Sequence, residues 1–207
     1  MSADPELHVS SQPYPWPYEG LHPPSLALVL AGWDRYWASV VEDPDGVVAR
    51  CASLAHAVNA AGGRVVVVAH QRPRRGASGG SASVAALPID ELPATTVAVS
   101  SGGVDGFFAG DLDLTLRNAR IGQLVVAGLG LEGPVHSTLR SANDRGLEGL
   151  LVPEACAPVD AELVAGSLSS ICMSGGIFGA VAGFDAVVAL LASAASSLAP
   201  LTQETRS

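Results

Sequence analysis

Short apolar runs alternate with amphipathic segments along most of the chain. Residues 26–31 and 64–69 are continuous apolar runs of strand length, which is typical of strands buried on both faces. The same pattern predicts further strands at 95–100, 123–128, 147–153 and 176–181. Helical periodicity with Pro or Asp near the start predicts helices at 43–63, 111–122, 133–146, 159–171 and 184–199, and a Gly/Ser-rich surface loop at 71–83.

This alternation predicts an α/β fold: a three-layer α-β-α sandwich around a mostly parallel sheet of about six strands, with Rossmann-type topology. We expect one domain over residues 25–200, preceded by an arm (1–24) and followed by a tail (201–207). Ligands bind such sheets at the carboxyl ends of the strands. The segments to search for a site are therefore 31–37, 69–75, 100–106 and 129–136.

The first 24 residues are rich in proline and aromatic side chains. The sequence PYPWPYEG at 13–20 predicts a stiff, extended, polyproline-like arm. An arm that carries Trp16, Tyr14 and Tyr18 needs an apolar surface to bury them. That surface belongs either to the arm's own domain or to a neighbouring subunit.

Composition excludes several classes of protein. The 207 residues are 48% hydrophobic and 15% charged, which excludes a disordered chain. The net charge is -9, and Arg72, Arg74 and Arg75 form the one small basic patch, so no nucleic-acid partner is expected. Every basic residue is arginine. Schiff-base and lysine general-base chemistry are therefore excluded.

Three cysteines lie far apart without a CxxC motif, so neither disulfides nor a zinc site is indicated. The N-terminal residues lack the features of a signal peptide, and no apolar run is long enough to span a membrane. None of the three SGG tripeptides is followed by the Lys-Ser/Thr of a phosphate-binding loop. We therefore expect a cytoplasmic protein with no metal, cofactor or membrane partner.

Four segments carry a resemblance to a known family. They are PYPWPYEG (13–20), FFAGDLDLTLRNARI (107–121), AGLGLEGPVHSTLRSANDRGLEGLLVPEAC (127–156) and MSGGIFGAVAGFDAV (173–187). The chain resembles the isochorismatase-like cysteine hydrolases over nearly its whole length, and most closely their biuret hydrolase and ureidoacrylate amidohydrolase branch. The resemblance implies the family fold, an amidohydrolase class acting on non-peptide C–N bonds, and assembly into dimers or tetramers.

The resemblance also implies a catalytic Asp, Lys and Cys. In the family, the Cys thiolate attacks an amide carbonyl, the Asp handles its proton, the Lys supports the pair, and backbone N–H groups hold the oxyanion. Residue by residue, the Asp position falls on Gly32, the Lys position on Ser101 and the Cys position on Pro134. All three catalytic side chains are therefore expected to be missing. Proline also removes one N–H donor of the oxyanion-hole type.

An alternative alignment does not restore the three groups. The chain has no lysine, and no cysteine lies between 52 and 155. We expect Cys51, Cys156 and Cys172 to be small buried apolar side chains. A shift of the Asp position to Asp34 is conceivable, although Asp34 matches the family's Gln better. The pocket-building insertion between the second and third strands is also shortened here, which puts substrate binding in doubt.

Five residues define a possible residual pocket: Asp34, His70, Glu132, His136 and Trp33. Glu132 either caps the following helix or joins an acid–base site, and His136 is either a helix-surface residue or a base. His70 ends the second strand, where relatives place substrate or metal contacts, but a lone His indicates no metal. The sequence leaves open whether Trp33 and Trp37 fill the vacated pocket.

Two hypotheses follow. In the first, the chain is a family member without the catalytic triad, a non-catalytic binding or assembly subunit. Its expected partners are copies of itself, an active isochorismatase-like paralogue or a small-molecule ligand. In the second, it hydrolyses a small amide or another C–N substrate, with Asp34, Glu132 and His136 in place of a cysteine nucleophile. The second requires these three groups to meet in one open pocket.

Overall fold

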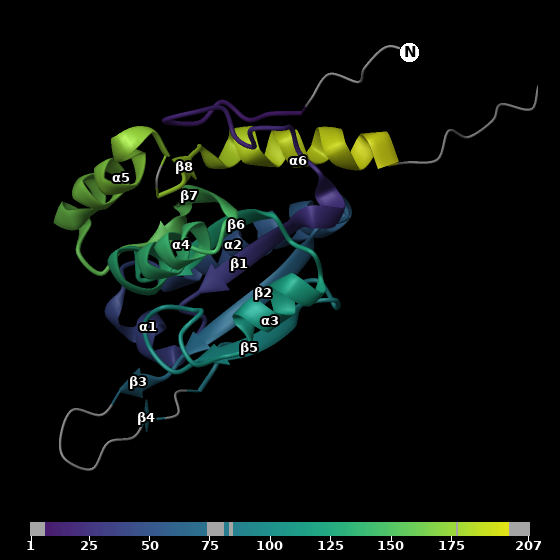
Figure 1. The fold of residues 1–207 in the computed structure, drawn as a ribbon. Helices are drawn as coiled ribbons and strands as arrows, with labels where there is room; N and C mark the ends of the chain where they lie inside the picture. Colours follow the sequence, from purple (N-terminus) through teal and green to yellow (C-terminus); the bar gives the residue numbers. More distant parts are fainter. Residues whose placement is uncertain (1–6, 74–80, 83–84, 177, 199–207) are drawn as a thin grey trace, which may run out of the picture.

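A computed structural model describes residues 7–73, 81–82, 85–176 and 178–198 of the chain. Its centre is a six-stranded sheet in the order β5-β2-β1-β6-β7-β8, in which every neighbouring pair is parallel (Figure 1). The strands are β1 (Leu26–Ala31), β2 (Arg64–His70), β5 (Val97–Ser101), β6 (Gln123–Leu129), β7 (Glu148–Ala157) and β8 (Ala180–Val181). The predicted fold class is confirmed.

All five predicted helices are present, although those predicted at 111–122, 133–146 and 159–171 are several residues shorter. They are α2 (Pro44–Ala60), α3 (Leu112–Asn118), α4 (His136–Asn143), α5 (Val164–Cys172) and α6 (Phe184–Leu198). At the start of α2, Asp43 accepts a hydrogen bond from the Gly46 N–H, and Pro44 occupies the first turn, as expected of a capped helix. One short helix, α1 (Arg35–Val40), was not predicted.

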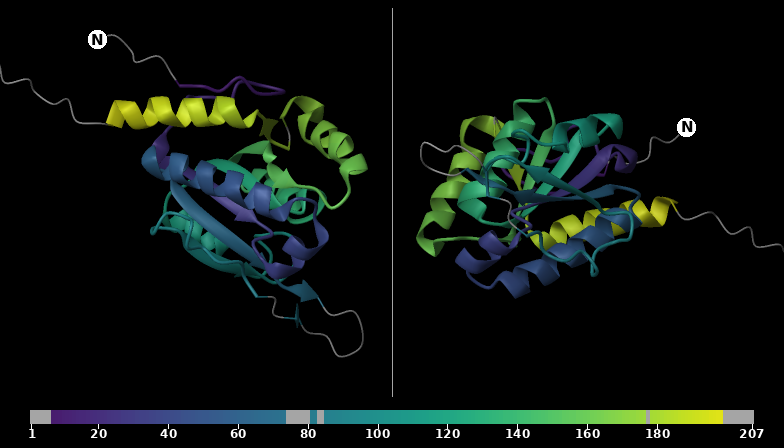
Figure 2. Two further views of the ribbon diagram at one scale, coloured as in Figure 1. Left: turned by 180° about the vertical axis from the view of Figure 1, so that it is seen from behind. Right: turned by 90° about the horizontal axis from the view of Figure 1, so that it is seen from below.

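Helices cover both faces of the sheet. Helices α2 and α6 lie on one face, and α3 and α4 lie on the other, with α5 packed beside β8 (Figures 1 and 2). Every residue of β1 and β6 is buried. The continuous apolar runs form the central strands, because a strand that is apolar on both faces must be buried between two layers of helices.

Two strands depart from their predicted lengths. β7 continues beyond Pro153, where its register with β6 shifts between Val126 and Gly128. Proline has no N–H to give to the ladder, so pairing breaks there and resumes at Cys156. β8 is shorter than the predicted 176–181, because residues Met173–Gly176 form a 3-10 turn, η4.

The N-terminal arm packs on its own domain. Trp16 is fully buried, and its Nε1–H donates to the Glu148 carbonyl at 3.2 Å. The arm folds back on itself through the Val9–Trp16 bridge, and Gln12 pairs with Val181 of β8. The arm therefore supplies an antiparallel neighbour to the β8 edge of the sheet.

Part of the predicted surface loop at 71–83 pairs as a two-residue ribbon, β3 (Arg72–Pro73) with β4 (Ser81–Ala82). Arg74, Arg75, the 78–80 SGG and the predicted tail 201–207 lie outside the described residues. Within the described ranges, no helix has both the length and the apolar character to cross a bilayer.

Candidate functional site

The three positions predicted to correspond to catalytic groups lie at the carboxyl ends of strands, where parallel sheets place their ligands. Gly32 directly follows β1, Ser101 is the last residue of β5, and Pro134 lies in the turn that follows β6. Each has a local structural role that can be read from its contacts.

Gly32 has no room for a side chain. Its φ is +69°, in the left-handed region that favours glycine. A Cβ added there would lie 2.1 Å from the Leu129 carbonyl oxygen and 3.2 Å from Cγ of Pro134. The backbone after β1 therefore touches the backbone at the end of β6, and any larger residue at position 32 would force the two apart.

Ser101 is fully buried and organises the loop after β5. Its hydroxyl lies within hydrogen-bond distance of the carbonyl oxygens of Gly103 (3.1 Å) and Phe108 (3.2 Å), as well as that of Asp105. The same oxygen accepts a bond from the Gly103 N–H at 3.2 Å. The hydroxyl is held by backbone groups of this loop, so its contacts are those of a loop-closing residue.

Pro134 lies inside a π-turn, η2 (Leu131–Val135), instead of opening a regular helix at 133 as predicted. A regular α-turn would need an N–H at residue 134 to reach the Gly130 carbonyl, and proline has none. The N–H of Val135 bonds that carbonyl at 3.3 Å instead. The missing donor thus explains the wider turn, and α4 begins only at His136.

The half-buried indole of Trp37 covers this turn. A Cβ at Gly130 would lie 2.6 Å from Trp37 Cε3, and a Cβ at Gly133 would lie 2.9 Å from Trp37 Cη2. The ring therefore lies against the bare backbone of both glycines, next to Pro134. The sequence left open whether Trp33 and Trp37 both fill this region. In the structure Trp37 covers the turn and Trp33 does not.

Trp33 is buried away from the turn. Its Nε1–H donates to the Pro88 carbonyl at 3.2 Å, and its carbonyl accepts from the Leu87 N–H at 3.1 Å. These bonds attach residues 87–88 to the chain after β1. Trp33 lines a separate cavity on the α2 side, described below.

Asp34 is fully buried and caps α1. Its Oδ1 accepts from the N–H groups of Tyr36 and Trp37, each at 3.1 Å, and its Oδ2 accepts from the His70 N–H at 2.9 Å. This carboxylate joins the ends of β1 and β2 to the new helix. An Asp at an N-cap position was the sequence signal that would have predicted α1.

His70 is also buried, with 2% of its surface exposed. Its Nδ1 lies 3.0 Å from the Gly103 carbonyl, so Nδ1 carries the proton and donates it. Nε2 has no hydrogen-bond partner within the described chain. Burial lowers the pKa of His70, while the Gly103 carbonyl and the carboxylates of Asp34 and Asp105 oppose that shift. The ring is therefore neutral at pH 7.

Glu132 and His136 line a surface hollow of about 270 Å³ against α5, together with Leu163, Gly166, Ser167 and Ser170. Both carboxylate oxygens of Glu132 accept backbone bonds, from Val159 N at 2.9 Å and Asp160 N at 3.1 Å. Burial lowers the pKa of His136, and Arg140 lowers it further. Asp34 is not among the lining residues, so this hollow does not unite the three predicted acid–base groups.

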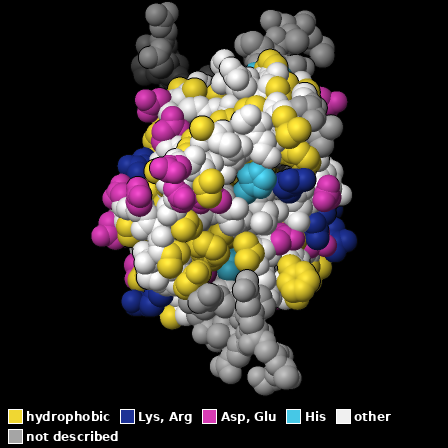
Figure 3. All heavy atoms as spheres, turned by 90° about the vertical axis from the view of Figure 1, so that its left-hand side faces the viewer, with side chains coloured by type: hydrophobic (Ala, Val, Ile, Leu, Met, Phe, Trp, Pro, Cys, Tyr) yellow, Lys and Arg dark blue, Asp and Glu magenta, His cyan; other side chains and the backbone are white. Residues whose placement is uncertain are grey.

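The face that carries α4 and α5 is mostly uncharged near its middle. A histidine lies there with a basic side chain beside it, and acidic groups lie around them (Figure 3).

Among the described residues, no group of three His, Cys, Asp or Glu side chains comes together to hold a metal ion.

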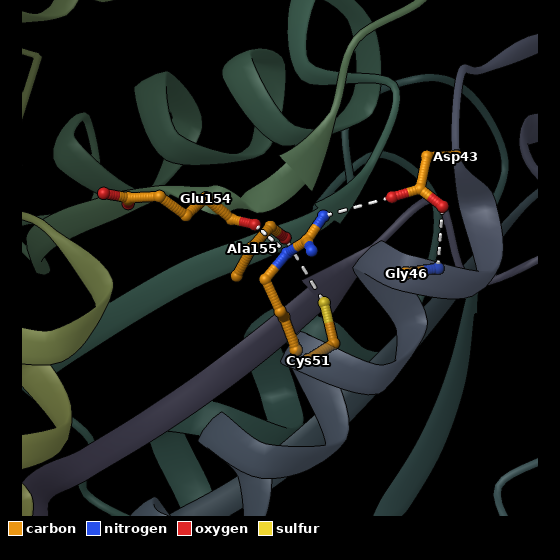
Figure 4. Close-up of polar contacts among 6 residues, drawn as sticks. Asp43, Gly46, Cys51, Glu154 and Ala155 are labelled. Carbon is orange, nitrogen blue, oxygen red and sulfur yellow. Dashed lines mark hydrogen bonds and ion pairs between the residues drawn. The ribbon is translucent and has the colours of Figure 1, made fainter.

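Cys156 lies near the carboxyl end of β7, opposite Gly128 of β6, but the cysteines do not have the character of a nucleophile. Cys51 on α2 is buried, its Sγ–H donates to the Ala155 carbonyl at 3.3 Å (Figure 4), and burial raises its pKa to about 12. Burial raises the pKa of Cys156 even more clearly, and its thiol donates to Val152. A reactive thiol needs a lowered pKa. The pKa of the third thiol, Cys172, is raised too, by partial burial.

Beside Cys51, an arginine ties α2 to β7. The Arg50 guanidinium donates to the Glu154 carbonyl and approaches the Asp43 carboxylate at 3.5 Å. Figure 4 shows Asp43 turned toward both this contact and the Gly46 N–H. The Arg50 guanidinium therefore binds the start of α2 and the backbone of β7. The raised pKa values of Cys51 and Cys156 keep both thiols protonated at pH 7.

The isochorismatase domain family matches residues 27–183, and the chain belongs to this family. Solved structures share its fold. A cysteine hydrolase from Pseudomonas syringae pv. phaseolicola 1448A has a TM-score of 0.74 at 21% identity, over 94% of this chain and 100% of that one. A nicotinamidase from Staphylococcus aureus has a TM-score of 0.60 at 16% identity, over 76% of this chain and 98% of that one.

An isochorismatase family protein from Burkholderia thailandensis gives a TM-score of 0.66 at 22% identity, over 83% of this chain and 97% of that one. At such identities the likeness establishes the fold and not the chemistry. The predicted superfamily is therefore confirmed, while the branch and the fate of the triad stay predictions.

Replacing Gly32 with Ala tests the close approach of β1 and β6. Gly146 supplies a matched control, because its φ is +74° and nothing lies within 4 Å of its Cβ position. We expect Gly146→Ala to cost about 1–2 kcal/mol for the left-handed backbone alone. Gly32→Ala adds the clash and should cost at least about 2 kcal/mol more. Urea unfolding measures both, and equal losses would contradict the geometry.

Burial of two neutral histidines predicts a pH dependence of stability. Because the pKa values of His70 and His136 are lowered on folding, the unfolded chain binds more protons below pH of about 6.5. Stability should therefore fall between pH 7.5 and 5.5, by at most about 1.4 kcal/mol per pH unit for each histidine. His70→Asn keeps a donor for the Gly103 carbonyl and should make the urea unfolding midpoint depend less on pH. His136→Asn should do the same for the contribution of His136. A pH dependence of the urea midpoint that is the same in the wild-type protein and in both variants would refute this.

Proposed function

We propose that the chain is a non-catalytic member of the isochorismatase family, of the biuret hydrolase and ureidoacrylate amidohydrolase branch, and acts as a binding or assembly subunit. The observation that carries the proposal is the turn after β6. Where the family's nucleophile is expected, Pro134 supplies neither a thiol nor an N–H, and the Trp37 indole lies against Gly130 and Gly133.

The other two catalytic positions support the same proposal. Gly32 has no space for a carboxylate side chain, and the Ser101 hydroxyl is held by backbone carbonyls. No lysine exists anywhere in the sequence. A thiolate would therefore lack its proton acceptor, its supporting cation and part of its oxyanion hole, which together supply most of the rate acceleration in this kind of chemistry.

A second candidate function rests on the hollow lined by Glu132 and His136. A neutral histidine at an open surface can act as a general base toward a small C–N substrate. Two observations weigh against it. Both Glu132 oxygens already accept backbone N–H groups, and Asp34 is buried as a helix cap. This acid–base hydrolase is therefore the alternative and not the conclusion.

We further propose that the chain assembles with copies of itself or with an active family member. Loss of chemistry with retention of a fully packed fold suits a structural or regulatory subunit, or a sensor of a small ligand in the cytoplasm. The fold keeps an extensive apolar core around β1 and β6, as a structural subunit requires.

Amide hydrolysis tests the proposal. The purified protein and its Pro134→Cys variant are assayed with nicotinamide, biuret and ureidoacrylate, with an active nicotinamidase as the positive control. We expect both proteins to be slower than the control by at least about 10⁴-fold, because restoring a thiol alone returns neither the Asp nor the Lys.

Two outcomes would change the conclusion. Turnover by the wild-type protein that iodoacetamide abolishes would refute the non-catalytic proposal. Turnover that resists iodoacetamide and disappears in His136→Ala, but persists in a His22→Ala control on the exposed chain before β1, would establish the acid–base alternative.

A further inference from the structure

A cavity of about 650 Å³ lies on the α2 side of the molecule, apart from all three positions discussed above. Three parts of the chain form it: the first turns of α2, the chain after β1 with α1, and residues 85–92, here called the acidic strap. Its volume falls within the range of small-molecule sites. Its lining residues are Trp33, Ala38, Pro44, Asp45, Val48, Ala49, Ala52, Leu87, Pro88, Asp90, Glu91 and Leu92.

The walls of the cavity are held in place by hydrogen bonds. The Arg35 N–H donates to Ala85 O at 2.9 Å, and Leu87 N–H donates to Trp33 O at 3.1 Å. The Trp33 indole bonds Pro88 O at 3.2 Å, and the ring of His56 on α2 bonds Glu91 O at 2.9 Å. The strap is therefore attached to the body at both ends, and the cavity is a formed feature of the fold.

The charge of the cavity is one-sided. Most of its lining is apolar, and the charged members among the described lining residues are the carboxylates of Asp45, Asp90 and Glu91. Within the part of the chain that the structure describes, none of these carboxylates has an ion pair or side-chain hydrogen bond, and all three residues are exposed. The α2 N-terminus adds a partial positive charge of about +0.5, which is too small to balance three carboxylates.

We infer that this cavity binds a small organic cation with an apolar body, such as an arylalkyl ammonium or guanidinium ion. The apolar walls would take the body of the ligand, and the unpaired carboxylates at the mouth would face its charge. An anion would meet three like charges, and a neutral ligand would gain only the apolar contacts. The cavity shares Trp33 with the predicted residual pocket, but none of Gly32, Ser101 and Pro134 is among its described lining residues, so the inference does not depend on whether the chain is catalytic.

Three probes of one shape test the inference. Phenethylammonium, 2-phenylethanol and phenylacetate are titrated into the full-length protein by calorimetry at low salt. We expect the cation to bind, the alcohol to bind more weakly and the anion not to bind up to about 10 mM. Added salt should weaken cation binding, because the carboxylates are exposed.

Two variants locate the binding. Asp90→Asn with Glu91→Gln should weaken cation binding about five- to tenfold, since each exposed carboxylate contributes modestly. The matched control, Glu162→Gln with Asp185→Asn, removes the same charge from exposed residues elsewhere and should leave binding unchanged. Ala49→Phe fills the cavity from an exposed helix position and should abolish binding of both cation and alcohol.

Several results would overturn the inference. Equal affinities for the three probes, no binding of the cation, or binding that both the charge variant and Ala49→Phe leave intact would each do so. A different occupant would also overturn it: if the face is covered by a second copy, the cation does not bind and Ala49→Phe dissociates an oligomer. Melting temperatures of all variants confirm that each is folded when it is titrated.

Discussion

The close approach of β1 and β6 at their carboxyl ends constrains everything around the candidate site. A Cβ at Gly32 would lie 2.1 Å from the Leu129 carbonyl, and a Cβ at Gly128 would lie 2.1 Å from the Ala31 carbonyl. The backbones of these paired strands thus stay in contact beyond their last paired residues, Ala31 and Gly128. The chain leaves β1 through a left-handed glycine, and this turn carries Trp33 and Asp34 into the interior.

Most polar side chains near the carboxyl ends of the strands hydrogen-bond to other parts of the same chain. Asp34 caps α1 and accepts from His70, Ser101 closes its own loop, and Glu132 holds the chain at 159–160. Catalytic sites usually leave some polar groups poised for substrate, at a cost in stability. Here only Nε2 of His70 is buried without a partner among these groups. The polar groups at this end of the sheet are therefore mostly satisfied within the fold.

The sequence predicted the sheet well because its strands are continuous apolar runs with no competing periodicity. It predicted less where one residue decides local geometry. Pro134 was expected at a first helical turn, but its missing N–H widens the turn into a π-turn that starts at 131. Asp34 was considered a catalytic candidate, and its side chain instead starts an unpredicted helix.

The site could be predicted only in part for a related reason. Residue identities located the strand ends and the absent lysine, but contacts between distant segments have no periodic signal. The cover of Gly130 and Gly133 by Trp37, and the cavity closed by residues 85–92, depend on such contacts. Neither follows from spacing along the chain.

Native mass spectrometry of the protein isolated from its source cells tests the central claim most directly. As a partner subunit of an active relative, the chain is expected in a stoichiometric mixed oligomer with a second isochorismatase-family chain that carries the Asp, Lys and Cys. Recovery of this chain alone, with no second family member, would contradict its role as a partner subunit.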